Sequence, residues 1–160
     1  MKIKLFLLFS FGLSLNLFGQ NNDTQKKFEQ ELHSYFRSGD LKKQEIVNSE
    51  TKDKIFKLFL DNSFVGYAIL ASAKGRMDTF DFVIIYNSQK EIKLVKVLVY
   101  RSQHGQEITN KNWLKQFYKN TVQFVYGKDI QAISGATLSA KSITEKINTL
   151  NFVVSEISTF

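Results

Sequence analysis

Hydrophobic runs separated by short polar turns along the middle of the chain predict a series of β-strands. Apolar and polar residues alternate at 91–100, whereas 54–60 is apolar on both faces and 80–86 is a nearly continuous apolar run, and turns such as Asp61-Asn62-Ser63 separate the runs. The last two runs are joined by a polar stretch at 87–90, which predicts a hairpin. The predicted strands are 44–48, 54–60, 64–72, 80–86 and 91–100.

Helical spacing appears on both sides of this strand region. At 24–37, Phe28 and Leu32 share one face with Tyr35 and Phe36, and a polar Ser-Gly-Asp sequence ends the pattern. Near the C-terminus, Ile143, Ile147 and Leu150 recur at i, i+4 and i+7 and predict a helix that begins near Thr137. Two N-cap positions are compatible with the sequence. Ser142 and Glu145 have capping-box spacing, whereas Thr137 or Ser139 would cap the helix one turn earlier.

Three shorter elements complete the prediction. Trp113 and Phe117 have the spacing of one helical turn, and packing of that turn onto the sheet is the favoured role of the Trp113 side chain. The apolar residues of 121–126 predict a short strand that leads, through a turn at 127–129, to 130–133. A final strand is predicted at 152–157.

These elements predict one α+β domain with a curved, mostly antiparallel sheet and packed helices. The chain has 160 residues, 43% of them hydrophobic and 15 of them Phe, which suffices for a packed core. No linker-like stretch rich in Pro, Gly or Ser divides it.

The N-terminal residues 1–19 have the pattern of a secretory signal peptide. Lys2 and Lys4 precede an apolar run, and the small Gly19 is suited to cleavage. The run is short for a membrane span, so we expect removal after about Gly19 and a mature domain at 20–160. The predicted location is periplasmic or secreted, with association at a membrane surface as a further option.

Charge and cysteine content narrow the classes of function. Loss of the two signal lysines lowers the formal net charge from +7 to +5, and the basic residues are dispersed, which argues against nucleic acid as a partner. The chain has no Cys, so disulfides, thiol catalysis and Cys-ligated metal sites are excluded. No metal site is predicted, because His33 lacks Cys, His or carboxylate partners at ligand spacing, and His104 is expected to be a solvated loop residue. Redox chemistry would therefore need a bound cofactor.

One short motif carries candidate chemistry: Ser134-Gly135-Ala136-Thr137, followed by Leu138-Ser139. Two small residues between two hydroxyls allow another molecule to approach the backbone closely. A phosphate esterified to Thr137 would lie near a helix N-terminus, where free N–H groups and the helix dipole favour an anion. A plain helix-entry turn has a similar composition and is the alternative.

The motif resembles the covalent flavin attachment site of FMN-binding domains in RnfG and NqrC type electron-transport subunits. In that family a flavin transferase moves FMN from FAD onto the threonine. The resemblance implies that Thr137 carries FMN through a phosphoester. It also implies that Ser134, Gly135 and Ala136 form the turn recognised for modification, and that Leu138 and Ser139 flank the phosphate.

Other segments resemble the family in the same order along the chain. Gly66-Tyr67 is similar to its opening strand, and the loop containing Gly105 precedes a Trp-Leu-x-x-Phe sequence at 113–117. By this resemblance Gly105 and Trp113 are candidates for bordering the flavin ring. The family usually has an acidic residue three positions before the serine, where this chain has Gln131.

The resemblance implies a periplasmic electron carrier with FMN as cofactor, without catalytic residues of its own. Its partners would be a flavin transferase and redox proteins of the membrane or periplasm. Gln131 motivates a different class of function, a secreted non-redox binding or accessory module of the same fold. A flavin enzyme that reduces a substrate is the third hypothesis, weakened because the chain has no nicotinamide or haem motif.

Overall fold

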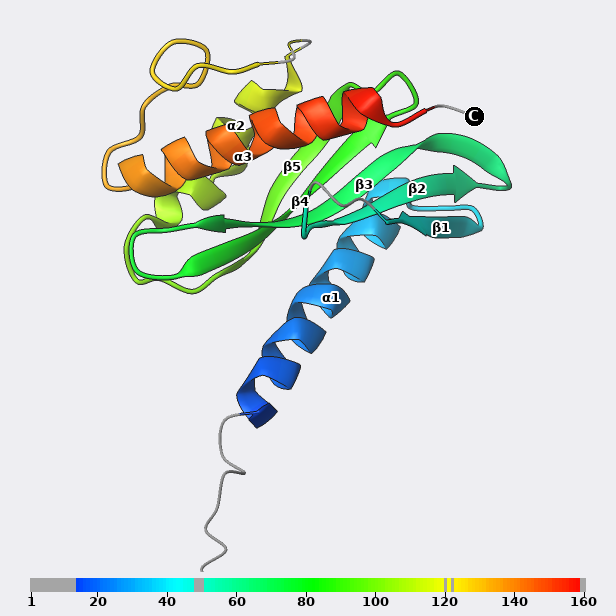
Figure 1. The fold of residues 1–160 in the computed structure, drawn as a ribbon, viewed down its shortest axis with the longest axis horizontal. Coiled ribbons are helices and arrows are strands. Elements are labelled where there is room, and N and C mark those ends of the chain that lie inside the picture. The colour runs from blue at the N-terminus through cyan, green and yellow to red at the C-terminus, as the bar shows by residue number, and fades with distance from the viewer. Residues whose placement is uncertain (1–13, 48–50, 120, 122, 159–160) are drawn as a thin grey trace, which may run out of the picture.

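The structure is a computed structural model that describes residues 14–47, 51–119, 121 and 123–158, with the backbone alone for 14–21. Five strands follow one another as an antiparallel meander, each paired with the next in the sequence. Figure 1 shows the strands as one twisted sheet. The strands are β1 Leu41–Ile46, β2 Lys54–Leu60, β3 Ser63–Lys74, β4 Thr79–Asn87 and β5 Ile92–Tyr100.

All five predicted strands are present, and so is the β4–β5 hairpin. The boundaries of β2 agree with the prediction. β1 begins earlier than predicted, and Asn48, the last residue of that predicted strand, lies outside the described residues. β3 extends to Lys74, two residues beyond the predicted end at Ser72. Asp61 and Asn62 both have positive φ, the conformation that suits a tight two-residue hairpin turn between β2 and β3.

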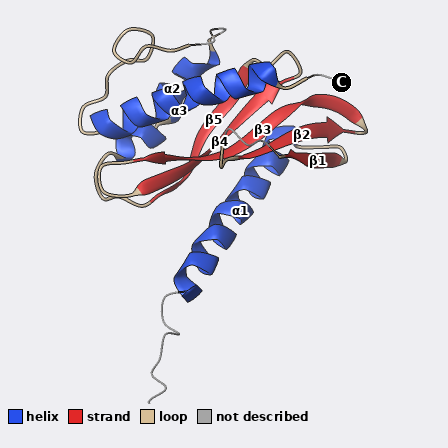
Figure 2. Cartoon of the chain, viewed as in Figure 1, coloured by secondary structure: helices blue, strands red, loops and turns tan. Residues whose placement is uncertain are grey.

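Helices cover both faces of the sheet (Figure 2). α3 lies on one face beside α2, and α1 crosses the opposite face and extends beyond it (Figure 1). The helices are α1 Ser14–Phe36, α2 Lys111–Leu114 and α3 Thr137–Glu156, with two short 3₁₀ helices, η1 Gln106–Thr109 and η2 Lys115–Tyr118. This arrangement confirms the predicted single α+β domain.

The two faces bury two separate hydrophobic clusters. On the α3 face, Ile143 and Ile147 pack with strand residues such as Phe82 and Ile84. On the α1 face, Phe28 and Leu32 pack with residues that alternate with that set, among them Phe56, Val83 and Ile85. Both sets of alternating β4 side chains are therefore buried, which explains the continuous apolar sequence of this central strand.

Two predicted strands near the C-terminus are wrong. Residues 152–156 continue α3, because Val153 and Val154 extend the buried stripe of Ile147 and Leu150. Of the described residues in 121–126, only Tyr126 forms a β-bridge, with Ile130. The backbone of Phe124 is instead satisfied by the Asn148 side chain, whose amide accepts from the Phe124 N–H at 2.8 Å and donates to its carbonyl at 2.9 Å.

α1 begins at Ser14, earlier than the predicted helix at 24–37. The predicted cleavage point after Gly19 falls within this helix, and residues 1–13 of the predicted signal peptide lie outside the described residues. Within the described residues, none of the helices combines the length and the hydropathy needed to cross a membrane.

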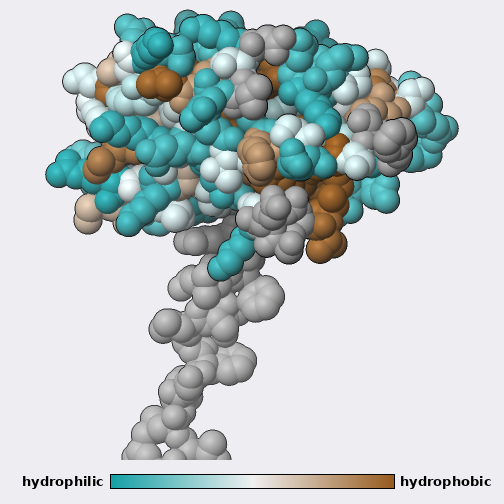
Figure 3. All heavy atoms as spheres, turned by 45° about the horizontal axis from the view of Figure 1, so that its top comes forward, coloured by the Kyte–Doolittle hydropathy of each residue, from teal (hydrophilic) through white to brown (hydrophobic). Residues whose placement is uncertain are grey.

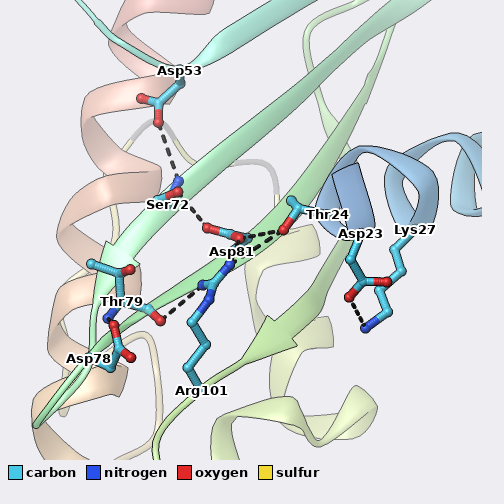
Figure 4. Close-up of polar contacts among 9 residues, drawn as sticks. All are labelled: Asp23, Thr24, Lys27, Asp53, Ser72, Asp78, Thr79, Asp81 and Arg101. Atoms are coloured by element: carbon cyan, nitrogen blue, oxygen red, sulfur yellow. Dashed lines mark hydrogen bonds and ion pairs between the residues drawn. The ribbon is translucent and has the colours of Figure 1, made fainter. Parts of the chain in front are cut away.

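A buried polar cluster attaches α1 to the sheet (Figure 4). The Asp81 carboxylate accepts hydrogen bonds from Thr24 of α1 at 2.8 Å and from Ser72 of β3 at 2.6 Å, and it forms an ion pair with Arg101. Arg101 also donates to the Thr79 carbonyl at 3.1 Å. Burial alone raises the pKa of the Asp81 carboxyl, but the bonds from Arg101, Ser72 and Thr24 outweigh it and hold the pKa below its ordinary value.

The visible exterior is largely hydrophilic (Figure 3).

Candidate functional site

The Ser-Gly-Ala-Thr motif forms the entry to α3. Ala136 is the N-cap residue and Thr137 is the first residue of the helix. Because Ala136 has no side-chain oxygen, the helix begins without a side-chain cap. The predicted caps are therefore wrong. The Ser139 hydroxyl pairs with Tyr100 instead, and the Ser142 hydroxyl accepts from the Lys74 N–H at 3.0 Å.

The missing cap leaves the first turn of α3 rich in free donors. The Ala140 N–H bonds to the Ala136 carbonyl at 2.9 Å, which is the regular bond that starts the helix. The N–H groups of Thr137, Leu138 and Ser139 precede this bond and have no acceptor within the helix. Together with the helix dipole, they favour a negatively charged group at Thr137.

Gly135 gives the turn before the helix its shape. Its φ of +81° lies in the left-handed region, where residues with a side chain are strained. A Cβ at this position would lie 3.0 Å from Oε1 of Glu107, so a larger residue would also crowd that side chain. The turn therefore requires glycine, and it brings Glu107 beside the motif.

The loop containing Gly105 lies against the first turn of α3. A Cβ on Gly105 would lie 2.5 Å from the Tyr100 hydroxyl and 3.2 Å from Ser139 Oγ. The Tyr100 hydroxyl donates to the His104 carbonyl at 2.7 Å and lies 2.9 Å from Ser139 Oγ. Since the single Tyr100 proton goes to the carbonyl, the Ser139 hydroxyl is the donor to Tyr100. Gly105 thus allows the loop and the helix to approach closely.

A surface depression of about 280 Å³ lies where the loop and the helix meet. Thr137 and Leu138 line it and are exposed, whereas Ala136 and Ser139 are buried in its wall. Arg76, from the turn between β3 and β4, contributes a cation. The complete lining is Arg76, His104, Gly105, Gly135, Ala136, Thr137, Leu138 and Ser139. Six of the eight predicted cofactor residues therefore border one depression, which we call the Thr137 depression.

Ser134 and Trp113 do not line this depression. Ser134 is exposed one residue before Gly135. Trp113 is 7% exposed, packs edge-on against Phe117 and belongs to the core on the α3 face, as expected from its helical spacing. Its indole N–H donates to the Gln131 carbonyl at 2.8 Å, so it fixes the segment that leads to the motif.

Both backbone polar groups of Gln131 are hydrogen-bonded to side chains. Its carbonyl accepts from Trp113, and its N–H donates to Gln116 Oε1 at 2.8 Å. Its side chain is exposed, so a carboxylate at this position would meet solvent. The carboxylate that does lie beside the motif belongs to Glu107, from another segment of the chain.

The residues present fit a phosphate-bearing group tethered at Thr137. The helix supplies a hydroxyl acceptor and free N–H donors, and Arg76 supplies the charge that a phosphodiester needs. In the described part of the chain, His and acidic residues form no group able to hold a metal ion.

Three residues at this site were missed by the sequence reasoning. Arg76 and Glu107 are distant in sequence from Thr137, and no spacing connects them to it. Tyr100 was recognised in the sequence only as the last residue of the predicted strand 91–100. A weak signal existed for Arg76, because it follows Gly75 between two predicted strands, where an exposed position is expected.

Comparison with known proteins gives no family assignment: no family model matches the chain, and no curated protein matches it.

Proposed function

We propose that the chain is a secreted or periplasmic electron carrier with FMN attached covalently to Thr137. The observation that carries the proposal is the position of Thr137: an exposed hydroxyl, first in a helix without a side-chain cap, bordering a depression that also contains Arg76. The resemblance of the motif to FMN-binding domains supplies the identity of the cofactor.

Attachment would use the Thr137 hydroxyl as the nucleophile. Its oxygen forms a bond to the FMN phosphorus of FAD, the bond to AMP breaks, and the hydroxyl proton passes to the transferase or to water. The product is a phosphodiester with one negative charge. The first-turn N–H groups and Arg76 are the groups that would stabilise this charge.

FMN would supply one-electron or two-electron redox chemistry, and the protein would hold and orient it. Arg76, Gly105 and Ala136 would shape the phosphate end, while Trp113 acts through the core by fixing the approach to the motif. Ser134 and Gly135 belong to the turn that the transferase would recognise. The proposed redox partners are proteins of the membrane or periplasm.

Intact mass of the mature protein after co-expression with an active flavin transferase tests the proposal. We expect the mass of one added FMN, retained after denaturation, together with a yellow colour. Absence of FMN, with a known substrate of the same transferase labelled in parallel, would reject the carrier.

A secreted accessory module without cofactor is the second candidate. Gln131 favours it, since the family that the motif resembles usually has an acidic residue there. This candidate predicts an unmodified mass under the same conditions, so the one measurement separates the two functions.

A further inference from the structure

We propose that the isoalloxazine ring of the attached FMN lies in a second depression, beside the turn between β3 and β4, with Met77 and Arg101 in its walls. This inference rests on the proposed function and adds the position of the ring. The second depression, which we call the Met77 depression, has a volume of about 500 Å³. Its lining residues are Arg76, Met77, Asp78, Arg101, Ser102, Gln103 and His104.

The two depressions adjoin each other. Arg76 and His104 line both, so they form the boundary between the Thr137 depression and the Met77 depression. The Thr137 depression, at about 280 Å³, is small for a whole cofactor, because ligand sites generally measure about 300 to 1,000 Å³. A phosphate at Thr137 with its ribityl chain passing Arg76 and His104 would bring the ring into the larger space.

The Met77 depression has a fixed planar cation in its wall. The Arg101 guanidinium bonds to the Thr79 carbonyl at 3.1 Å and to Thr24 Oγ1 at 3.4 Å, and it pairs with Asp81 (Figure 4). Its side chain is 17% exposed. These bonds hold the guanidinium in one orientation, so a planar ring or its carbonyl oxygens could contact it with little loss of side-chain entropy.

Met77 presents an apolar surface to the same space. A hydrogen bond of 2.7 Å from the Gly75 N–H to the Asp78 carbonyl closes the turn and leaves Arg76 and Met77 at its tip. Met77 is 80% exposed, and a thioether makes favourable contacts with aromatic rings. Leu138, 58% exposed, is the corresponding apolar residue of the Thr137 depression, so the alternative direction for the ring is over Leu138.

The charge of Arg76 also suits a flavin. The charge of Arg101 is paired with Asp81, and Asp78 adds a carboxylate to the lining, so Arg76 is the cation of this depression whose charge is not paired with a carboxylate in the described structure. A reduced flavin has more negative charge on its pyrimidine side than an oxidised one. Charge near that side is a principal means by which a protein tunes a flavin. We therefore expect Arg76→Gln to lower the midpoint potential of the attached FMN. Arg76→Lys keeps the positive charge and should have a midpoint potential close to that of the wild type.

Tryptophan placed in contact with a flavin ring quenches its fluorescence by electron transfer from the indole, which gives a direct test. Three single variants are flavinylated by co-expression with the transferase: Met77→Trp, Leu138→Trp and, as the matched exposed control, Phe152→Trp. Phe152 is 59% exposed on α3. It lies about 22 Å along the helix axis from Thr137, from the rise per residue. Intact mass establishes equal loading before emission is compared.

We expect Met77→Trp to lose most of the flavin emission, while Leu138→Trp and Phe152→Trp keep emission close to that of the wild type. Equal loading with unchanged emission in Met77→Trp, or stronger quenching in Leu138→Trp, would overturn the ring position and leave the carrier function intact. A wild-type protein without FMN would overturn both. Because Met77 is exposed, replacing it should leave the fold unchanged, which urea denaturation checks.

Discussion

The Tyr100 hydroxyl lies 2.9 Å from the Ser139 hydroxyl and joins the end of β5 to the first turn of α3. Tyr100 also donates to the His104 carbonyl at 2.7 Å, so one phenol fixes both the loop and the helix that border the Thr137 depression. Ser139 is only 2% exposed, and its bond to Tyr100 replaces contact with water.

We expect Tyr100→Phe to lower the free energy of unfolding by about 1 to 3 kcal/mol, because the variant leaves a buried Ser139 hydroxyl and the His104 carbonyl without this partner. Urea denaturation of the unflavinylated protein measures the change. Tyr35→Phe is the control, since Tyr35 is exposed and its hydroxyl loss should cost less than about 0.5 kcal/mol. Equal stability of the two variants would show that the Tyr100–Ser139 contact contributes nothing.

Trp113→Ala should lower the free energy of unfolding by about 3 to 5 kcal/mol, because a large core side chain is removed and a cavity remains. Trp113→Phe should cost less in packing but still lose the bond to the Gln131 carbonyl, which contributes about 1 kcal/mol. Phe152→Ala, at an exposed site on α3, provides the control for loss of an aromatic ring. A Trp113→Ala protein as stable as that control would contradict the core position.

Stability should depend on the ionisation of Asp81. The folded-state pKa of this carboxyl is lowered, so its contribution is fully present above the unfolded-state pKa of about 3.9 and is lost as pH falls through the folded value. At neutral pH, Asp81→Asn should cost at least about 1.5 kcal/mol, because hydrogen bonds to a charged group are lost and Arg101 is left without its partner.

The difference in unfolding free energy between the wild type and Asp81→Asn isolates this group from the other carboxyls. We expect the difference to stay constant from about pH 7 to pH 5 and to shrink below about pH 4. Urea denaturation at a series of pH values measures it. A difference that grows on acidification would mean that the folded-state pKa of Asp81 is raised.

Thr137→Ala should abolish covalent FMN and leave the fold intact. Thr137 is the first residue of α3 and makes no side-chain cap, so its replacement should cost no more than about 0.5 kcal/mol. Ser134→Ala is the matched hydroxyl deletion and should retain label, because Ser134 lies outside the depression. Peptide mapping of the flavinylated protein locates the modified residue, and FMN found on Ser134 or Ser139 would disprove the assignment.

Gln131→Asp should raise the flavinylated fraction if the transferase requires a carboxylate at this position. The side chain is exposed and the backbone is held by Trp113 and Gln116, so the substitution should not disturb the turn. Intact mass at limiting transferase measures the fraction, with Gln131→Glu as a test of side-chain length. An unchanged fraction would show that the residue is not read by the transferase.

The sequence was sufficient for the elements whose apolar residues have a strict period. β5 alternates clearly, β2 and β4 are apolar runs bounded by polar turns, and Ile143, Ile147 and Leu150 define the buried stripe of α3. Successive strands also pair with their sequence neighbours, so the meander follows from short turns such as that at Asp61 and Asn62. The motif that begins at Ser134 could also be recognised from the sequence, because its residues are contiguous.

Tertiary structure decided whatever depends on partners distant in the sequence. The final predicted strand became part of α3 because Val153 and Val154 bury against the sheet, and β-branched residues alone do not distinguish the two outcomes. The caps proposed from spacing failed because Tyr100 and the Lys74 N–H bind the Ser139 and Ser142 hydroxyls. Arg76 borders the same depression as Thr137 because the β3–β4 turn lies beside the start of α3, a proximity that no local pattern records.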